Sequence, residues 1–475
     1  MSNFYSFLTF DPKKVFRFFI AMVFPIITYL IFVLFQHPAI YQNTLAKITH
    51  TYSRDTMVKI NVWKVDEPYY FKNKKNLLSW DAGIYNDIRC HYYSDEDQTY
   101  AFFPLFPMLW KFLNIDIEYI SFFNYLLFSL AIIILSSLFL NPEKLSDAES
   151  IIVFMLALTL PMVVVIYLPY AEAVYILTFS VAAWGWIKNK YWMYFIFMTL
   201  FAMSRPVFMN AGLAFIIADV LLFAKHRNFF RFLKEMFLKI VPLVLGTIIV
   251  FYLFYLNSGN FLKYFETVEK WWQVHFQIPS KITDWSIEGF GMNVFAIFFV
   301  IILSAILLAN NFFKVLKSKG ENDSSEENRI DQAKEYFFNV SLLYFCGVFV
   351  TLIFFQNGSM NGLCRYVFSS PFFFVFLFHL YSEYNQIKIK KILLFFIPAT
   401  VLSFLMLIGF EKYEPQLNFS DSGYLTFLLS FTYLFFMRRM NALWRYTLLA
   451  IIIFYNLVWV TYLYNMFLCN AWIYT

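Results

Sequence analysis

Asp81 is the carboxylate with the most distinctive surroundings in this chain. It lies in segment 79–85 (SWDAGIY), ahead of a second aromatic motif at 102–107 (FFPLFP). Both motifs fall in the first long polar stretch of a chain that is otherwise mostly apolar. A carboxylate held at a membrane face can take the proton from a hydroxyl group as its oxygen attacks, which is general base catalysis. Asp81 is therefore the leading catalytic candidate.

Other ionisable and aromatic side chains follow Asp81 closely in the sequence. Asp81 and Asp87 are six residues apart, so on a helix they would not share a face and would make a poor pair of catalytic carboxylates. We expect one base with supporting groups, and a solvated acidic loop is the alternative. The candidates for the supporting, substrate-binding or phosphate-binding groups are Trp80, Tyr85, Asp87, Arg89 and His91.

Three charged residues farther along the chain lie at breaks between apolar stretches. Glu172 is costly there unless it is paired or at the interface, although it could also be an acid that complements a helix dipole. Arg205 and Arg365 lie beside Pro and Gly, where we place the outer membrane boundary. Guanidinium groups bind phosphate in a bidentate manner, so we expect both arginines to bind a lipid phosphate, with snorkelling to the interface as the alternative.

Trp272 and His275 lie in segment 269–275 (EKWWQVH), between two apolar stretches. Aromatic faces stack on sugars, which makes this segment a candidate substrate-binding loop. Tryptophan also favours the membrane interface for reasons unrelated to ligands. The sequence leaves these two interpretations open.

The composition is that of an integral membrane protein. Of the 475 residues, 60% are hydrophobic and only 14% are charged, and a soluble protein could not keep so much apolar surface out of water. Apolar runs recur from Val15 to Leu468, which predicts an all-α polytopic protein with one domain, 1–475. The net charge of +6 does not indicate a nucleic-acid partner, because the basic residues gather in particular loops.

We expect about 13 transmembrane helices, each needing roughly 20 apolar residues. The first apolar run, 15–35, lacks a small-residue cleavage site and is typical of a signal anchor. The region 192–224 could form two short helices or one long, tilted helix. The predicted spans are 15–35, 119–140, 150–168, 172–187, 191–203, 207–224, 240–256, 291–309, 337–356, 366–382, 392–410, 424–437 and 446–468.

The distribution of Lys and Arg predicts the orientation. With the N-terminus in the cytoplasm, 22 of the 37 basic residues fall in inner segments, as the positive-inside rule requires. The long outer loops are then 36–118 and 257–290. The first contains 41–63, whose apolar spacing predicts a helix lying on the membrane surface. The inner segment 310–336 is predicted to be a solvated, flexible connector.

Motifs for metals and nucleotides are absent from the sequence. The four cysteines show no metal-ligand spacing, so we expect no metal cofactor. Cys90 and Cys364 could both face outward, which makes a disulfide conceivable, but two unpaired thiols are the simpler interpretation. The lack of a P-loop and of a GxGxxG strand–turn–helix argues against a nucleotide-hydrolysing transporter or a Rossmann-type enzyme.

Together these motifs resemble those of a known family. Segments 80–85 (WDAGIY) and 101–107 (AFFPLFP) look like the WDA…FFPxxP signature of the PIG-V family, which comprises GPI mannosyltransferase 2 and its bacterial relatives. Segment 170–175 (YAEAVY) and segment 204–212 (SRPVFMNAG) resemble two further family segments in the same order. Trp272 falls where the family has an aromatic outer stretch. The resemblance covers about residues 75 to 370.

The resemblance implies a GT-C-type fold with surface-lying helices in the first outer loop. It also implies an inverting glycosyltransferase that uses a polyprenyl-phosphate-linked sugar, typically mannose, and an acceptor that is a glycan, glycolipid or protein. Asp81 would be the acidic catalytic residue. Because the chain is rich in Phe, Ile, Asn and Lys, we expect a bacterial inner membrane, with the active site on the outer face.

Two other classes of function remain open on the sequence. A flippase or transporter for a lipid-linked glycan would be expected to show an internal repeat of broken spans, and we find no repeat. An O-antigen ligase or polymerase would use a diphosphate-linked glycan and would be expected to rely on outer arginines and a histidine rather than on a Trp-Asp motif.

Overall fold

The computed structural model describes residues 12–40, 76–94, 97–141, 145–206, 208–226, 229–284, 287–317, 326–383, 389–409, 417–468 and 470. The surface helix expected at 41–63 lies outside these residues. Every regular element in the described ranges is a helix, and the nearest approach to a sheet there is one isolated bridge between Thr283 and Ser359. The chain is therefore an all-α protein over the described ranges.

The helices follow one another as the apolar runs predict. In chain order they are α2 (Pro12–Phe35), α3 (Pro38–Ile40), η2 (Asn76–Leu78), α6 (Asp81–His91), η3 (Thr99–Ala101), α7 (Leu105–Leu113), α8 (Ile117–Phe139), α9 (Asp147–Ala157), η4 (Pro161–Val163), α10 (Val164–Tyr167), α11 (Glu172–Ile187), α12 (Tyr191–Ser204), α13 (Phe208–His226), α14 (Phe229–Ser258), α15 (Lys263–Trp272), α16 (Ile287–Phe295), η5 (Ala296–Ile301, a π-helix), α17 (Ile302–Lys317), α18 (Glu326–Phe355), α19 (Leu363–Phe368), α20 (Pro371–Glu383), α21 (Ile389–Gly409), α22 (Leu417–Phe436), η8 (Met437–Arg439) and α23 (Ala442–Leu468).

Several of these helices are long and apolar enough to cross a membrane. Six of the described helical stretches meet this criterion, or seven if the bent pair 147–157 and 161–167 is one broken span. Four shorter apolar helical stretches, of 10–17 residues, accompany them. The protein is therefore a multi-pass membrane protein, although fewer helices meet the length criterion than the 13 spans we expected. The region 192–224 forms two helices, α12 and α13, rather than one.

Two of the predicted spans are interrupted inside the bundle. Pro161 stops α9 from running on, and the chain bends by 53° between 147–157 and 161–167. Pro371 begins α20 directly after a break that follows α19. Irregular backbone at membrane depth must be satisfied by protein or by water. The second break closely follows Arg365, one of the charged residues that the sequence analysis singled out.

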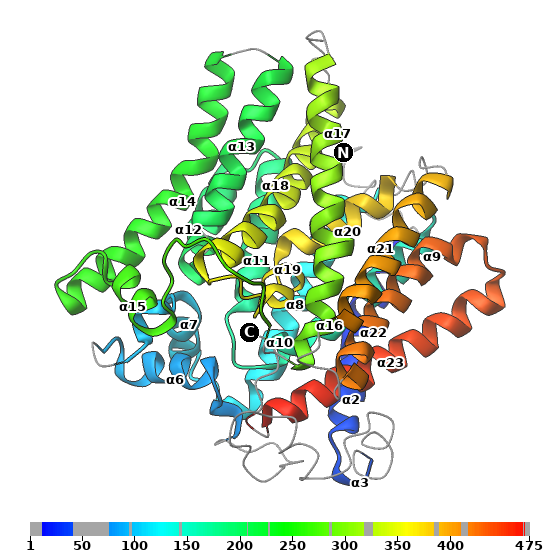
Figure 1. Ribbon diagram of the computed structural model, residues 1–475, viewed down its shortest axis with the longest axis horizontal. Helices are drawn as coiled ribbons and strands as arrows, with labels where there is room; N and C mark the ends of the chain where they lie inside the picture. Colours follow the sequence, from blue (N-terminus) through cyan, green and yellow to red (C-terminus); the bar gives the residue numbers. More distant parts are fainter. Residues whose placement is uncertain are drawn as a thin grey trace, which may run out of the picture.

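Figure 1 shows how these elements are arranged. α13 and α14 form a long antiparallel pair at the top of the view, and α6, α7 and α15 lie together near the lower end of α14. α11 packs between α8 and α12, and α20 packs against α8, α11 and α18. Aromatic rings such as Phe179, Phe201 and Phe372 fill this centre and contact one another.

The connecting segments are shorter than the sequence predicted. The proposed inner connector 310–336 is wrong at both ends, because α17 runs to Lys317 and α18 already begins at Glu326. Lys, Glu, Gln and Asn residues there continue the helices, as expected of polar side chains with good or adequate helix propensity. The segment 257–290, predicted to be an outer loop, contains the amphipathic helix α15, which packs against η3.

Close packing of α12 against α14 gives a first prediction. A Cβ atom on Gly246 would lie 2.4 Å from the Thr199 carbonyl oxygen and 2.8 Å from the Ala202 Cβ. We expect Gly246→Ala to lower the free energy of unfolding by about 1–3 kcal/mol, as overpacking does. Gly212→Ala on α13 is the matched control, because nothing lies within 4 Å of the added Cβ. Thermal unfolding in detergent measures both; equal behaviour of the two variants would contradict the packing.

Candidate functional site

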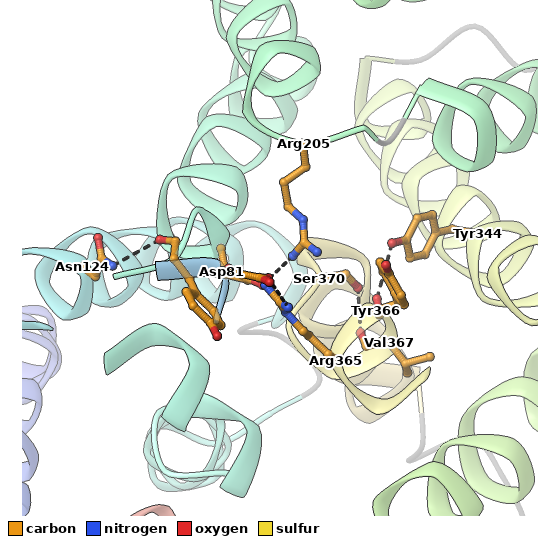
Figure 2. A network of polar contacts seen from close by, with 10 residues as sticks. Asp81, Asn124, Arg205, Tyr344, Arg365, Tyr366, Val367 and Ser370 are labelled. Atoms are coloured by element: carbon orange, nitrogen blue, oxygen red, sulfur yellow. Dashed lines mark hydrogen bonds and ion pairs between the residues drawn. The ribbon is translucent and has the colours of Figure 1, made fainter. Parts of the chain in front are cut away.

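Four charged side chains from distant parts of the sequence meet in the interior. We call Asp81, Glu172, Arg205 and Arg365 the charge cluster. Arg365 donates from Nη1 to Asp81 Oδ2 and from Nε to Glu172 Oε1, each at 2.7 Å. Arg205 donates from Nη1 to the same Glu172 Oε1, also at 2.7 Å. Figure 2 shows the two arginines approaching the carboxylates from different elements.

The side chains of the charge cluster are largely buried, so their charges must be paired with one another. The side chain of Glu172 is 1% exposed and that of Arg365 is 8% exposed, whereas Arg205 and Asp81 keep 13% and 18%. Charges removed from water are tolerated only when they are paired and hydrogen-bonded. Two carboxylates balance two guanidinium groups here, so the charge cluster has no net charge when all four groups are ionised.

Aromatic rings hold both guanidinium groups. Arg365 lies over the ring of Tyr170 at 4.6 Å, and Arg205 lies 5.7 Å from the rings of both Tyr175 and Tyr366. Such cation–π contacts stabilise a guanidinium group without using its N–H donors. Within the described ranges, Arg205 donates only from Nη1, so its remaining N–H groups are available to an anion.

The backbone leading to Glu172 is fastened by α8. The chain between α10 and α11 is irregular, and its carbonyl groups need partners inside the bundle. Asn124 Nδ2 donates to the carbonyl oxygens of Leu168 and Tyr170, at 2.8 and 3.2 Å. Ser121 donates to the Tyr167 carbonyl at 2.5 Å. These bonds fix the stretch that ends at Glu172, the first residue of α11.

Arg365 is positioned by a second irregular segment. Gly362 precedes α19 with φ of +80°, which favours glycine. The Cys364 amide donates to Asn293 Oδ1 at 2.7 Å, and Asn293 Nδ2 donates to Asp284 Oδ2 at 2.6 Å. A Cβ on Gly358 would lie 2.2 Å from the Lys281 carbonyl oxygen, so the two loops touch backbone to backbone there. α16, together with the loop before it, thereby fixes the position of α19.

Asp81 begins α6 after an unusual residue. Trp80 has φ of +55° and ψ of −134°, a conformation that is strained for a residue with a side chain. A Cβ on Gly83 would lie 2.8 Å from the Leu78 carbonyl oxygen, so glycine lets α6 close onto η2. Strained backbone of this kind persists only where the surrounding structure enforces it. The tight turn therefore aims Asp81 into the charge cluster.

Tyr85 forms an aromatic wall beside Asp81. Its ring contacts Phe102 and Phe106 at 5.2 Å and Tyr170 at 6.5 Å. Burial, followed by the charge of Glu172, raises the pKa of the Tyr85 hydroxyl far above its ordinary value. Tyr85 is therefore a neutral residue at any working pH.

Some predicted residues do not join the charge cluster. Arg89 lies over the Trp110 ring at 4.4 Å and donates to the Ile115 carbonyl at 3.4 Å, so it serves the contact between α6 and α7. His91 is exposed at the end of α6. Arg89 is thus engaged away from the charge cluster, while the contact of Arg89 and His91 with a donor phosphate stays a prediction. Asp87 is largely exposed. The part of its carboxyl group that is shielded from water raises its pKa, and the nearby charge of His91 lowers that pKa by a smaller amount.

Trp272 is connected to the site through one ring. It lies 6.3 Å from Phe102, which in turn contacts Tyr85, and 41% of Trp272 is exposed. His275 is exposed beyond the end of α15. The rings of Tyr85, Phe102 and Trp272 thus form an aromatic path from the α6 side of the site to the protein surface.

Sequence reasoning missed several residues of the site. Tyr170, Tyr175 and Tyr366 hold the arginines, and Asn124 and Asn293 hold the backbone. All three tyrosines carry a signal in the sequence, since Tyr170 and Tyr175 flank Glu172 and Tyr366 follows Arg365. The two asparagines stand out only as amides within apolar runs.

The thiols of Cys90 and Cys364 do not form a disulfide. Cys90 is exposed, Cys364 is buried and both are free thiols, which agrees with the simpler of our two interpretations.

No family model, curated protein or solved structure matches the chain.

The double contact of Arg365 gives a second prediction. Replacement by methionine leaves two carboxylates without that partner, and breaking a buried pair costs about 3–5 kcal/mol. We expect Arg365→Met to lower the free energy of unfolding by that order, measured by denaturant unfolding in mixed micelles. Arg89→Met, which removes an arginine from outside the charge cluster, is the control. A loss no larger than that of the control would show that the cluster contributes little to stability.

Proposed function

We propose that the charge cluster is the active centre of an inverting glycosyltransferase. The donor would be a sugar on a polyprenyl monophosphate, and the acceptor a hydroxyl group of a glycan, glycolipid or protein at the outer membrane face. One observation carries the proposal: the carboxylate of the Trp-Asp motif lies in direct contact with an arginine, and a second arginine nearby has donors to spare. Such a site has both a base and a phosphate receptor.

Arg205 is the better placed of the two arginines to receive the phosphate. Arg365 already donates to two carboxylates, whereas Arg205 has one such bond and a larger exposed fraction. A phosphate that approaches Arg205 comes close to Arg365 as well, because both donate to the same oxygen of Glu172. Glu172 is then a positioning residue that keeps the two guanidinium groups together.

Asp81 must be released before it can act as a base. In the described geometry its Oδ2 accepts a hydrogen bond from Arg365, so this oxygen is already engaged and is not free to accept from an acceptor hydroxyl. The donor phosphate competes with Asp81 for Arg365, so donor binding would free the carboxylate for the acceptor. This order of events couples the base to an occupied donor site.

The transfer step is balanced in atoms and charge. The acceptor oxygen bonds to the anomeric carbon from the face opposite the phosphate, and its proton passes to Asp81. The bond between the anomeric carbon and the phosphate oxygen breaks, and the electron pair leaves with polyprenyl phosphate. Arg205 and Arg365 stabilise the negative charge that develops on this leaving group. No step requires a metal, since a monophosphate leaving group carries less charge than a diphosphate.

The aromatic path and the fold fit the same proposal. The rings of Tyr85, Phe102 and Trp272 offer stacking faces for a sugar next to Asp81. Mannose as the sugar, a GT-C-type fold with about 13 spans, a cytoplasmic N-terminus and a bacterial inner membrane remain part of the proposal on the strength of the motifs and the charge distribution.

A carrier for lipid-linked glycans is the second candidate. The broken stretch before α11 and the break before α20 place irregular backbone beside buried charges, as in many transporters. A carrier would move its substrate without changing the glycosidic bond. Transfer of a sugar to a new hydroxyl therefore separates the two functions.

The decisive experiment gives a third prediction. Purified protein with polyprenyl-phosphate mannose and a set of hydroxyl acceptors should form a glycoside, and Asp81→Asn should lower the rate by about 10²–10⁴, as loss of a general base does. Donor binding should persist in the variant, because both arginines remain. Glu266→Gln on α15 is the control, since that carboxylate is exposed. Equal rates for Asp81→Asn and wild type would remove Asp81 from the mechanism.

The role of Arg205 gives a fourth prediction. A lysine cannot bind phosphate through two parallel N–H groups, so Arg205→Lys should weaken donor binding by about 1.4 kcal/mol, or tenfold, and raise the KM for the donor. Competition with polyprenyl phosphate measures the affinity directly. Lys270→Gln removes a positive charge from the exposed side of α15 and should leave the affinity unchanged. An unchanged KM in Arg205→Lys would assign the phosphate to another residue.

A further inference from the structure

An apolar groove runs along the surface between α13 and α14, on elements that the charge cluster does not use. Its volume is about 880 Å³. Ile216 contributes from α13, and α14 contributes a row of side chains that extends from Leu233 to Ile248. Val244 and Ile248 are about half exposed, so the groove opens to the surroundings of the protein. Lys234 is the charged residue on its rim.

One end of α14 reaches beyond the hydrocarbon layer. The helix has 30 residues and is therefore about 45 Å long, against roughly 30 Å for the bilayer core. Every Lys, Arg and Glu of α14 falls within its first 11 residues, so the first turns are the part that lies among the headgroups. Phe230 and Phe237 are largely exposed there, as is typical of an interfacial segment. Figure 1 shows the beginning of α14 at the top of the view, beside the end of α13.

The groove is lined by a stretch of α14 whose backbone is supported by the neighbouring helix α12. Pro242 lies in the middle of the lining segment and cannot donate to the carbonyl group of Leu238, four residues earlier. The Tyr191 hydroxyl on α12 donates to that carbonyl at 3.0 Å, and the Tyr194 hydroxyl donates to the Lys239 carbonyl at 3.0 Å. The neighbouring helix thus satisfies the backbone exposed by the proline, and the groove needs no ligand to form.

The two lysines near the groove differ in whether their charge is already paired with a carboxylate. Lys239 is buried, forms an ion pair with Asp219 and lies over the Tyr336 ring at 3.7 Å. Glu235 lies 3.9 Å from Lys239 and faces the same pair. Lys234 is exposed and makes no ion pair with any described residue. A cation therefore remains at the mouth of an apolar groove, at headgroup depth.

We propose that this groove is a binding site for an anionic phospholipid of the leaflet at that end. One acyl chain lies along the row from Leu233 to Ile248, and the phosphate meets Lys234. An apolar channel below an available lysine matches the two parts of such a lipid, and one lysine near an anionic surface contributes about 1 kcal/mol. The site is independent of the proposed glycosyl transfer. In the proposed orientation the leaflet is the cytoplasmic one.

Native mass spectrometry of the detergent-solubilised protein, titrated with phosphatidylglycerol or phosphatidylethanolamine, tests the site. The wild type should retain the anionic lipid preferentially. Lys234→Gln should weaken its retention about fivefold, the equivalent of about 1 kcal/mol. Val244→Trp, which fills the groove, should abolish retention of the tightly held lipid. Lys391→Gln removes an exposed lysine from α21, outside the groove, and is the matched control.

The outcomes are distinct. Equal retention of both lipids by the wild type would overturn the choice of an anionic lipid. A loss in Lys391→Gln as large as in Lys234→Gln would show general charge attraction rather than a site. Retention unchanged by Val244→Trp would place the lipid elsewhere. Thermal unfolding of each variant shows whether it is folded, and for a misfolded Val244→Trp the smaller change Val241→Leu replaces it with the same expected direction.

Discussion

One oxygen atom of Glu172 joins the two arginines of the site. Both guanidinium groups donate to Oε1, while the carboxylate itself is almost completely buried. Both arginines reach this oxygen only if three segments are held in fixed positions relative to one another: the stretch before α11, the end of α12 and the start of α19. α8 fastens the first through Asn124, and α16 fastens the third through Asn293. The irregular backbone of the bundle is therefore the scaffold of its polar centre.

The same interaction explains where the chain departs from simple membrane helices. The contacts of Arg365 with Glu172 and Asp81 span 193 and 284 residues of sequence, so the charge cluster forms only when the whole bundle is assembled. Uninterrupted helices would carry these side chains past one another. Instead, α11 begins at Glu172, α12 ends just before Arg205 and α19 begins just before Arg365, so these charged side chains lie at helix ends that meet in the interior.

The sequence predicted the class of fold well and the site in part. Apolar runs locate the helices because membrane helices must be long and apolar. Asp81, Glu172, Arg205 and Arg365 were identified individually, since charges at membrane depth are costly enough to stand out. Their mutual pairing could not be predicted, because residue spacing carries no information about contacts between distant segments. Arg89 shows the same limit. Asp87 is the charged residue near it in sequence, but in the fold Arg89 contacts the ring of Trp110 on another helix.

The neutrality of the charge cluster has a consequence for how ligands reach it. Two positive and two negative groups within bonding distance cancel at long range, so a dissolved anion far from the protein feels no field from the site. The attraction of the arginines appears only at contact. Electrostatic steering through water therefore gives no advantage here. Under the proposed function, this arrangement suits a donor that arrives by diffusion within the plane of the bilayer and is presented to Arg205 at short range.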